Sequence, residues 1–229
     1  DMDLLITGNT ADYRSSVSRF FKNEPSGRLI EDTNQDIIGL KASSLKFMDL
    51  DNDGDQDLIA SGWNVIDNNL VTKVYQNEPL GTYVELPLDG LHAVAYGDID
   101  AVDIDHDGDL DISISGVDSV SNFATRVHSL SGKVYKNEGS FNFTELLDIP
   151  GARILRFADL NGDLKADIIS NGTTDLEDPQ SSFTDVYLND TNFSNSPPDA
   201  PTSLTSFAVS TRAIFTWGSG SDQIDSDAS

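Results

Sequence analysis

One acidic loop occurs three times in this chain, each time between two short apolar runs. Each copy is nine residues long and carries acidic or amide side chains at alternate positions, except for Lys165 in the third; the copies are residues 49–57, 103–111 and 159–167. A partial fourth copy at Asp1–Asp3 keeps only the end of the pattern. The last aspartates of the copies recur every 54 to 56 residues, at Asp3, Asp57, Asp111 and Asp167. Because recurrence at a fixed period indicates a repeat architecture, the chain is predicted to contain about four equivalent units, near residues 1–38, 39–89, 90–150 and 151–195.

A second motif recurs in step with the loop. It consists of an aromatic residue, any residue, Asn and an acidic residue, at positions 21–24, 75–78, 135–138 and 187–190. The rest of each unit is made of brief β-branched or aromatic runs bounded by Gly, Asn, Asp and Pro, without the periodicity of an amphipathic helix. In the second unit, strands are expected at 44–48, 58–61, 71–76 and 83–86. Four short strands per unit of this length predict an all-β chain of β-propeller blades.

The loop carries the kind of oxygen ligands that a calcium ion requires. Side chains at positions 1, 3, 5 and 9, with the carbonyl of position 7, can surround one hard cation. The predicted ligands are Asp49, Asp51, Asp53, Asp57 and the Asp55 carbonyl; Asp103, Asp105, Asp107, Asp111 and the Asp109 carbonyl; and Asp159, Asn161, Asp163, Asp167 and the Lys165 carbonyl. We therefore expect about three Ca²⁺ sites, one per complete loop, and a fourth, incomplete site at Asp1–Asp3.

The third loop departs from the other two at the position of its glycine. Gly54 and Gly108 occupy position 6, where glycine permits a sharp bend. The third copy has Leu164 at that position and Gly162 two residues earlier. Its geometry is expected to differ, and its Asn and Lys reduce its negative charge, so it is expected to bind calcium most weakly.

Two other interpretations of the loops were considered. An EF-hand also begins Asp-x-Asp-x-Asp-Gly, but it needs a Glu at position 12 and flanking helices. Position 12 here is Ala60, Ile114 or Ser170, inside an apolar run, so an EF-hand is excluded. The other alternative is a solvated charged turn that binds no ion, and the fixed register of three copies argues against it.

The loop closing on Ser-Gly, with Tyr-x-Asn-Glu downstream, resembles the FG-GAP (VCBS-type) repeats over about residues 1–195. This resemblance implies the seven-bladed calcium-binding propeller of integrin alpha subunits and of many secreted bacterial surface proteins, in which the loop joins the first two strands of a blade. Four units are too few for seven blades, so further blades are expected upstream in the same polypeptide. The extra sequence near Asp98 and Asp100 departs from the pattern, and these two are expected to be surface residues rather than ligands.

The last part of the chain has a different composition. Residues 196–203 have the Pro, Ser and Asn content of a linker. Residues 204–229, with a clear strand at 213–217, resemble the opening strands of a fibronectin type III domain. The alternative is a tail that pairs with the last blade.

Composition narrows the possible partners. The formal net charge is −25, which disfavours nucleic acid and anionic membranes as partners. There is no cysteine, hence no disulfide, zinc-thiolate site or thiol nucleophile, and no apolar run is long enough for membrane insertion. No motif of a known catalytic site is present, and His92, His106 and His128 are expected to be surface or packing residues. The chain is therefore not expected to be an enzyme.

The leading functional hypothesis is a non-enzymatic, extracellular, calcium-binding module for adhesion or ligand binding in a secreted or cell-surface, bacterial protein. The variable segments 9–17, 63–70 and 117–132 occupy equivalent places in successive units, so they are expected to form one rim that binds a protein or glycan, with Trp63 and Phe123 as candidate contacts. The alternatives are a lectin with sugars bound between blades, a non-catalytic module of a secreted polysaccharide-degrading enzyme, and a structural spacer.

Overall fold

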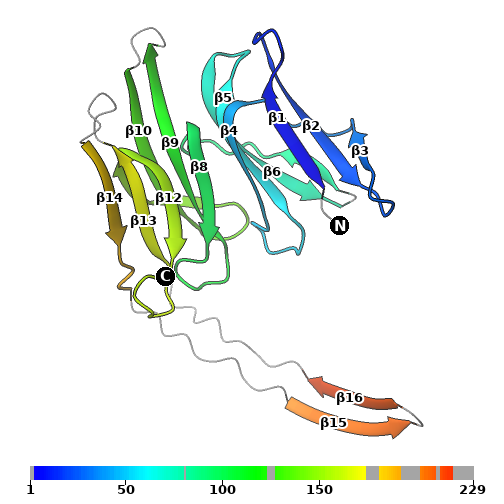
Figure 1. Ribbon diagram of the computed structural model, residues 1–229. Coiled ribbons are helices and arrows are strands. Elements are labelled where there is room, and N and C mark those ends of the chain that lie inside the picture. The colour runs from blue at the N-terminus through cyan, green and yellow to red at the C-terminus, as the bar shows by residue number, and fades with distance from the viewer. Residues whose placement is uncertain are drawn as a thin grey trace. The chain divides into compact units, whose positions relative to one another are not determined.

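The computed structural model describes residues 3–79, 81–122, 127–173, 181–191, 202–209 and 212–218. Every secondary-structure element in these described residues is a β-strand (Figure 1), which confirms the predicted all-β class. The described residues contain no helix with the length and hydrophobicity of a membrane-spanning segment. The chain divides into two units, one of residues 1–104 and 109–189 and the other of residues 105–108 and 190–229.

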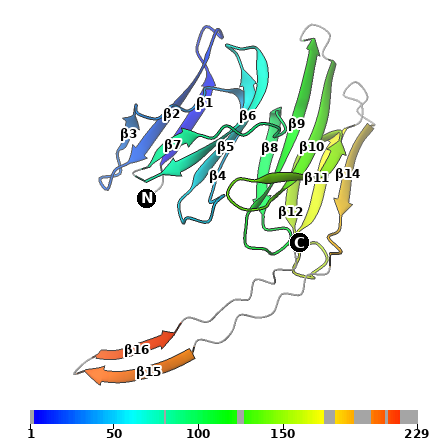
Figure 2. The same ribbon diagram turned by 180° about the vertical axis from the view of Figure 1, so that it is seen from behind.

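The first unit contains four antiparallel sheets in which strands that follow one another in the chain are hydrogen-bonded neighbours. The first sheet has β1 (Leu4–Asn9), β2 (Ser16–Asn23) and β3 (Leu29–Asp32); the second has β4 (Lys41–Met48), β5 (Asp57–Asn64), β6 (Asn69–Glu78) and β7 (Thr82–Glu85). The third has β8 (Ala95–Val102), β9 (Asp111–Asn122), β10 (Val127–Asn137) and β11 (Phe143–Pro150); the fourth has β12 (Ala152–Ala158), β13 (Asp167–Thr173) and β14 (Ser182–Tyr187). Each sheet lies within one sequence repeat, and the outer strands β7 and β11 are visible in Figure 2.

The four strands expected in the second repeat are confirmed, each within a longer or closely matching strand. The acidic loops connect β4 to β5, β8 to β9 and β12 to β13, so each joins the first two strands of a sheet. The loop motif identifies β1, β2 and β3 as the equivalents of β5, β6 and β7. In the second unit of the chain, β15 (Thr202–Val209) and β16 (Arg212–Gly218) form a two-stranded sheet of their own.

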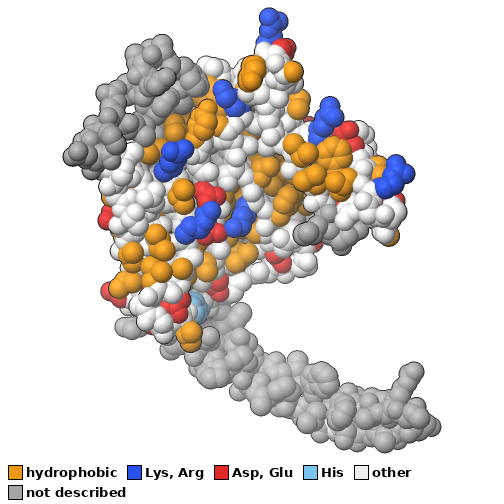
Figure 3. Space-filling view, viewed as in Figure 1, with side chains coloured by type: hydrophobic (Ala, Val, Ile, Leu, Met, Phe, Trp, Pro, Cys, Tyr) orange, Lys and Arg blue, Asp and Glu red, His pale blue; other side chains and the backbone are white. Residues whose placement is uncertain are grey.

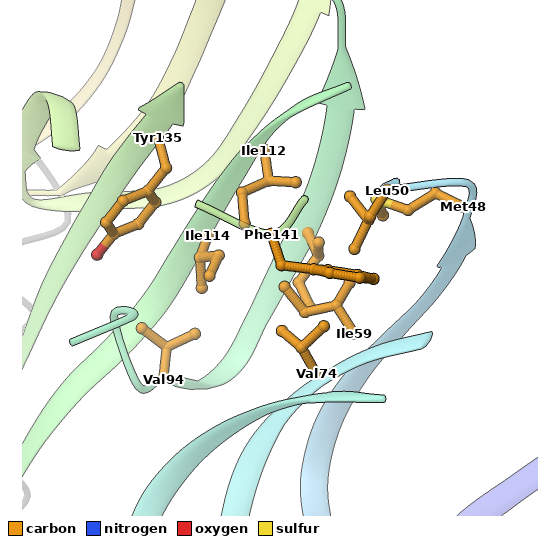
Figure 4. Close-up of a cluster of buried hydrophobic side chains, with 10 residues drawn as sticks. Met48, Leu50, Ile59, Val74, Val94, Ile112, Ile114, Tyr135 and Phe141 are labelled. Carbon is orange, nitrogen blue, oxygen red and sulfur yellow. The ribbon is translucent and has the colours of Figure 1, made fainter. Parts of the chain in front are cut away.

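The hydrophobic core lies between neighbouring sheets. The first strands of the last three complete repeats lie side by side, β4 beside β8 and β8 beside β12. One core cluster, drawn in Figure 4, packs Met48, Leu50, Ile59 and Val74 of the second repeat against Val94, Ile112, Ile114, Tyr135 and Phe141 of the third. Other clusters join the first repeat to the second and the third to the fourth. Each repeat therefore covers a hydrophobic face of its neighbour, as expected for propeller blades.

Two valines at the same repeat position test this packing. Val134, one residue before the Tyr of the second motif, is 0% exposed and packs in the cluster with Leu155 and Ile168 of the fourth repeat. Its equivalent in the fourth repeat, Val186, is 53% exposed. Val134→Ala is expected to lower the free energy of unfolding by about 2 kcal/mol, because buried methyl groups are lost and a cavity remains. Val186→Ala should change it by less than about 0.5 kcal/mol; equal effects in chemical denaturation would contradict this packing.

Candidate metal loops

The structure brings the carboxylates of the first two loops together. Oxygens of Asp49, Asp51 and Asp57 lie within 4.8 Å of one another, as do those of Asp103, Asp105 and Asp111. These six residues are among the predicted ligands. Two predicted side-chain ligands, Asp53 and Asp107, are outside the groups; Asp53 instead accepts a hydrogen bond from the backbone N–H of Asp55 at 3.0 Å.

The last aspartate of each loop connects the loop to the Asn of the second motif. Asp57 is fully buried, and its two oxygens accept the backbone N–H groups of Leu50 and Asn77, both at 2.9 Å. Burial raises the pKa of Asp57 to about 6, although these two hydrogen bonds act to lower it. The same bonds recur in the next two repeats, from Ile104 and Asn137 to Asp111, and from Leu160 and Asn189 to Asp167. In the partial first copy, Asp3 accepts the N–H of Asn23 at 2.9 Å.

Two buried oxygens of the first loop have no hydrogen-bond partner. They are Asp49 Oδ1 and Asp55 Oδ1. An unpaired buried carboxylate oxygen is unfavourable, because the group has lost water without gaining a donor. Burial, and then the charges of Asp53 and Asp51, raise the pKa of Asp55. The Asp55 carboxylate therefore interacts electrostatically with the other carboxylates of the loop, whereas the sequence pattern predicted only its backbone carbonyl as a ligand.

These features fit a bound divalent cation. Two unit charges about 4 Å apart repel by about 1 kcal/mol even in water, and by more where water is excluded. A hard cation removes this repulsion and supplies the missing partner to an oxygen such as Asp49 Oδ1. Carboxylate oxygens in this number, without a nitrogen or sulfur ligand, suit Ca²⁺.

All three loops have the same pattern of backbone conformation. Positions 4 and 6 have positive φ in each: Asn52 (60°) and Gly54 (95°), His106 (63°) and Gly108 (94°), and Gly162 (81°) and Leu164 (69°). The expectation that the glycine shift alters the third loop is therefore not supported at these two positions. Instead, the glycine occupies the other left-handed position, and Leu164 adopts a conformation that is unfavourable for a residue with a Cβ.

Leu164→Gly should therefore stabilise the protein. Leu164 is 82% exposed, so its side chain contributes little packing, while its left-handed backbone costs about 1 kcal/mol or more. Part of this gain is offset because glycine makes the unfolded chain more flexible. The net increase in the free energy of unfolding is expected to be about 0.5 kcal/mol, measurable by urea denaturation. A decrease would show that Leu164 makes contacts that offset its strain.

In the third loop, the first carboxylate, Asp159, is hydrogen-bonded by backbone N–H groups of the same loop. Both oxygens of Asp159 accept backbone N–H groups, from Gly162 at 2.7 Å and Leu164 at 3.0 Å, and the pKa of Asp159 is lowered chiefly by the bond from Gly162. The described loop 159–167 forms no close carboxylate group like the other two. Asn161 and Lys165 further reduce its charge. These features agree with the prediction of weakest calcium binding, which stays a prediction.

A hydroxyl at the end of the loop motif links each of the first three sheets to the chain segment that enters the next sheet. Ser61 Oγ donates to Val94 O at 2.9 Å and accepts from Val94 N at 3.1 Å. Thr7 makes the same pair of bonds with Leu40. Ser115 in the third repeat donates to Arg153 O and accepts from Leu155 N. The recurrence of Ser or Thr before Gly was visible in the sequence, but this bridging role was not.

Asp98 and Asp100 also bridge neighbouring sheets. Asp100 on β8 pairs with Lys46 Nζ of β4 at 2.9 Å and accepts the Phe157 N–H of β12 at 3.3 Å, and Asp98 pairs with Arg156. Figure 3 shows basic side chains in contact with acidic ones over these strands. The prediction that the two aspartates are not metal ligands agrees with these contacts.

His92 has a polar neighbourhood that sequence reasoning did not find. Its Nε2 lies 2.7 Å from Ser131 Oγ, which in turn donates to Asp118 Oδ2 at 2.8 Å. The serine lies between the histidine and the aspartate, so the order differs from that of a catalytic triad, in which the histidine is central. Burial lowers the pKa of His92, and the nearby Asp118 charge opposes this effect.

The position of His92 predicts a pH dependence. Because the pKa of His92 is lower in the folded protein than its ordinary value of 6.5, the unfolded chain binds the proton more readily. Stability contributed by neutral His92 is therefore present above pH 6.5 and is lost progressively as the pH falls below it. Unfolding free energies of the wild type and His92→Gln, measured between pH 5 and pH 8, should converge toward low pH. If the difference in unfolding free energy between the two proteins is the same at every pH, His92 does not titrate as inferred.

The hairpin turns between β1 and β2 and between β5 and β6 lie at the edge of the sheets opposite the acidic loops (Figure 1). They correspond to the predicted variable segments 9–17 and 63–70, whereas the turn in the segment 117–132 lies outside the described residues. Tyr13 and Ile66 are 75% and 73% exposed in these two turns. Trp63, a predicted contact, is half-buried within β5, and Phe123 lies outside the described residues.

Residues 49–114 match the FG-GAP-like repeat family. The match begins at the first aspartate of one loop and extends through the next loop into β9, and so includes both close carboxylate groups. No curated protein matches the chain. Residues 49–114 are thus similar to an FG-GAP-like repeat, and the antiparallel sheets of the first unit have the arrangement of β-propeller blades.

Proposed function

We propose that this chain is a non-enzymatic propeller module that binds Ca²⁺ in its loops and functions outside the cell, in a secreted or cell-surface protein. The observation that supports calcium binding most strongly is the pair of buried, unpartnered oxygens, Asp49 Oδ1 and Asp55 Oδ1, in the loop 49–57, where three carboxylates converge. The FG-GAP family match supports the same function. Extracellular calcium is abundant enough to occupy sites with dissociation constants of about 10⁻⁴–10⁻³ M, which are typical of extracellular modules.

The role of the ion in this proposal is structural. The last aspartates of the first two loops are buried and accept the backbone N–H of the Asn of the second motif, so they hold parts of the same sheet together. A cation bound in such a loop reduces the repulsion between its carboxylates. It also stabilises the position of the last aspartate, which is hydrogen-bonded both to the loop after the first strand and to the third strand of the sheet.

Calorimetric titration with CaCl₂ tests the metal part of the proposal. We expect the wild type to bind at least two Ca²⁺ and the double variant Asp49→Asn, Asp103→Asn to lose these two sites. Asp89→Asn removes an exposed carboxylate outside the loops and should bind like the wild type. Absence of calcium binding at millimolar concentration by the folded wild type would reject the proposal.

The hairpin rim is proposed as the surface that binds a protein or glycan. Exposed Tyr13 and Ile66 at equivalent turns support it, since exposed apolar side chains in neighbouring loops are typical of contact surfaces. A glycan array probed with the calcium-loaded chain separates the two partner classes. Binding that is lost in Tyr13→Ser, Ile66→Ser with calcium affinity unchanged would support a lectin. An array without signal would favour a protein partner.

A further inference from the structure

We propose that the loops 49–57 and 103–111 bind calcium cooperatively, because Asn137 joins them through a relay of hydrogen bonds. The inference rests on the proposed function, since both loops must bind Ca²⁺ for their affinities to be coupled. It adds a role for the Asn of the second motif, which recurs in step with the loop.

The relay passes through fully buried groups. The backbone N–H of Asn137 donates to Asp111 Oδ1 at 2.8 Å, which connects Asn137 to the loop of its own sheet. The Asn137 side chain crosses to the preceding repeat, where Nδ2 donates to Leu50 O at 2.9 Å. The N–H of Leu50 donates in turn to Asp57 Oδ2 at 2.9 Å. One continuous path thus connects Asp111 to Asp57, the last predicted ligands of the two loops.

The same path recurs one repeat later. Asn189 donates its N–H to Asp167 at 2.8 Å and its Nδ2 to Ile104 O at 2.9 Å. The N–H of Ile104 donates to Asp111 at 2.7 Å. Two separate pairs of repeats form the same path from equivalent residues. The path is therefore a recurring feature of the repeat rather than a contact specific to one pair.

A second link connects the first pair of loops directly. Nδ2 of Asn52, at position 4 of one loop, donates to Asp109 Oδ1, at position 7 of the next, at 2.6 Å. The left-handed backbone of Asn52 is tolerated better by Asn than by most residues. The two loops therefore share both a buried and an exposed connection.

These connections provide a physical route for coupling. Calcium in the loop 103–111 fixes Asp111, and with it the Asn137 donor that holds Leu50 in the neighbouring loop. A second ion then binds to a loop that is already partly ordered, so less conformational entropy is lost on binding. Repulsion between the bound ions opposes this effect, but in about 0.15 M salt charges separated by more than about 8 Å are largely screened.

A double-mutant cycle measured by calcium calorimetry on the full chain tests the proposal. All proteins carry Asp159→Asn, which weakens the third loop. The affinity of the loop 49–57 is measured with the loop 103–111 intact and with that loop disabled by Asp103→Asn and Asp105→Asn. We expect disabling to weaken the first loop by about 5-fold or more. In an Asn137→Ala background the same change should be less than about 2-fold.

Two further variants keep the test decisive. Asn189→Ala removes the equivalent link to the third loop and should leave the coupling between the first two loops unchanged. If Asn137→Ala does not fold, Asn52→Gly removes the exposed link while keeping the left-handed backbone, and should reduce the coupling measurably. If disabling one loop leaves the affinity of the other unchanged in the otherwise wild-type chain, the coupling is rejected and calcium binding stands. If neither loop takes up calcium, the proposed function itself is rejected.

Discussion

In about 10 mM CaCl₂ the protein should melt about 10 °C higher than in the same buffer with a calcium chelator. A ligand that binds only the folded state stabilises it by RT ln(1 + [L]/Kd). With dissociation constants of about 10⁻⁴–10⁻³ M, each site contributes about 1.4–2.7 kcal/mol at this concentration. Two sites therefore contribute about 3–5 kcal/mol, and in a chain of this size each kcal/mol raises the melting temperature by about 2–4 °C.

The comparison has two controls. The same concentration of MgCl₂ should give a much smaller shift, because Mg²⁺ requires a compact octahedron and loses its water reluctantly. The double variant Asp49→Asn, Asp103→Asn should respond less to calcium than the wild type. An equal shift in Mg²⁺ and Ca²⁺, or in the double variant, would indicate a general charge effect on a chain with net charge −25.

Gly116→Ala is expected to lower the free energy of unfolding by about 3 kcal/mol. Gly116 follows the bridging Ser115 and has φ of 151°, a conformation that residues with a Cβ rarely adopt. A Cβ there would lie 2.8 Å from Ala95 O and 2.8 Å from Gly97 Cα, which are backbone atoms of β8 and cannot easily move away. The register of β8 against β9 shifts at this point, between Ala95 and Asp98, so the glycine permits a bulge.

Gly8→Ala is the matched control, because Gly8 occupies the same repeat position on β1. A Cβ at Gly8 would meet no atom within 4 Å, and its φ is not in the left-handed region. Its effect on the free energy of unfolding should be within about 0.5 kcal/mol. Chemical denaturation of the two variants measures the difference. Similar costs at both positions would mean that close approach of β8 and β9 does not determine the need for glycine.

The fold was predictable from the sequence because the repeats supply independent copies of one pattern. The recurrence of Asp3, Asp57, Asp111 and Asp167 placed the sheets, and the runs that follow them are β1, β5, β9 and β13. The loop spacing also placed Asp49, Asp51 and Asp57 in one predicted set of ligands, and oxygens of these three residues lie within 4.8 Å of one another. Asp53, which was predicted with them, is outside this group, so the spacing alone did not show which carboxylates converge.

Contacts between repeats were not predictable in the same way. Asn137 and Leu50 are 87 residues apart, and no local rule places a side chain of one sheet against a carbonyl of another. The neighbourhood of His92 depends on β9 and β10 folding over the segment before β8. Leu164 was expected to alter its loop, whereas positions 4 and 6 keep the same left-handed pattern and tolerate a strained leucine.

The direct test of calcium binding is a crystal structure grown with calcium, in which anomalous scattering locates the ions. We predict one ion among Asp49, Asp51 and Asp57 and one among Asp103, Asp105 and Asp111, each surrounded by oxygen ligands at about 2.3–2.6 Å. If both loops are ordered in crystals grown at millimolar calcium but contain no ion, the claim that these loops bind calcium is contradicted.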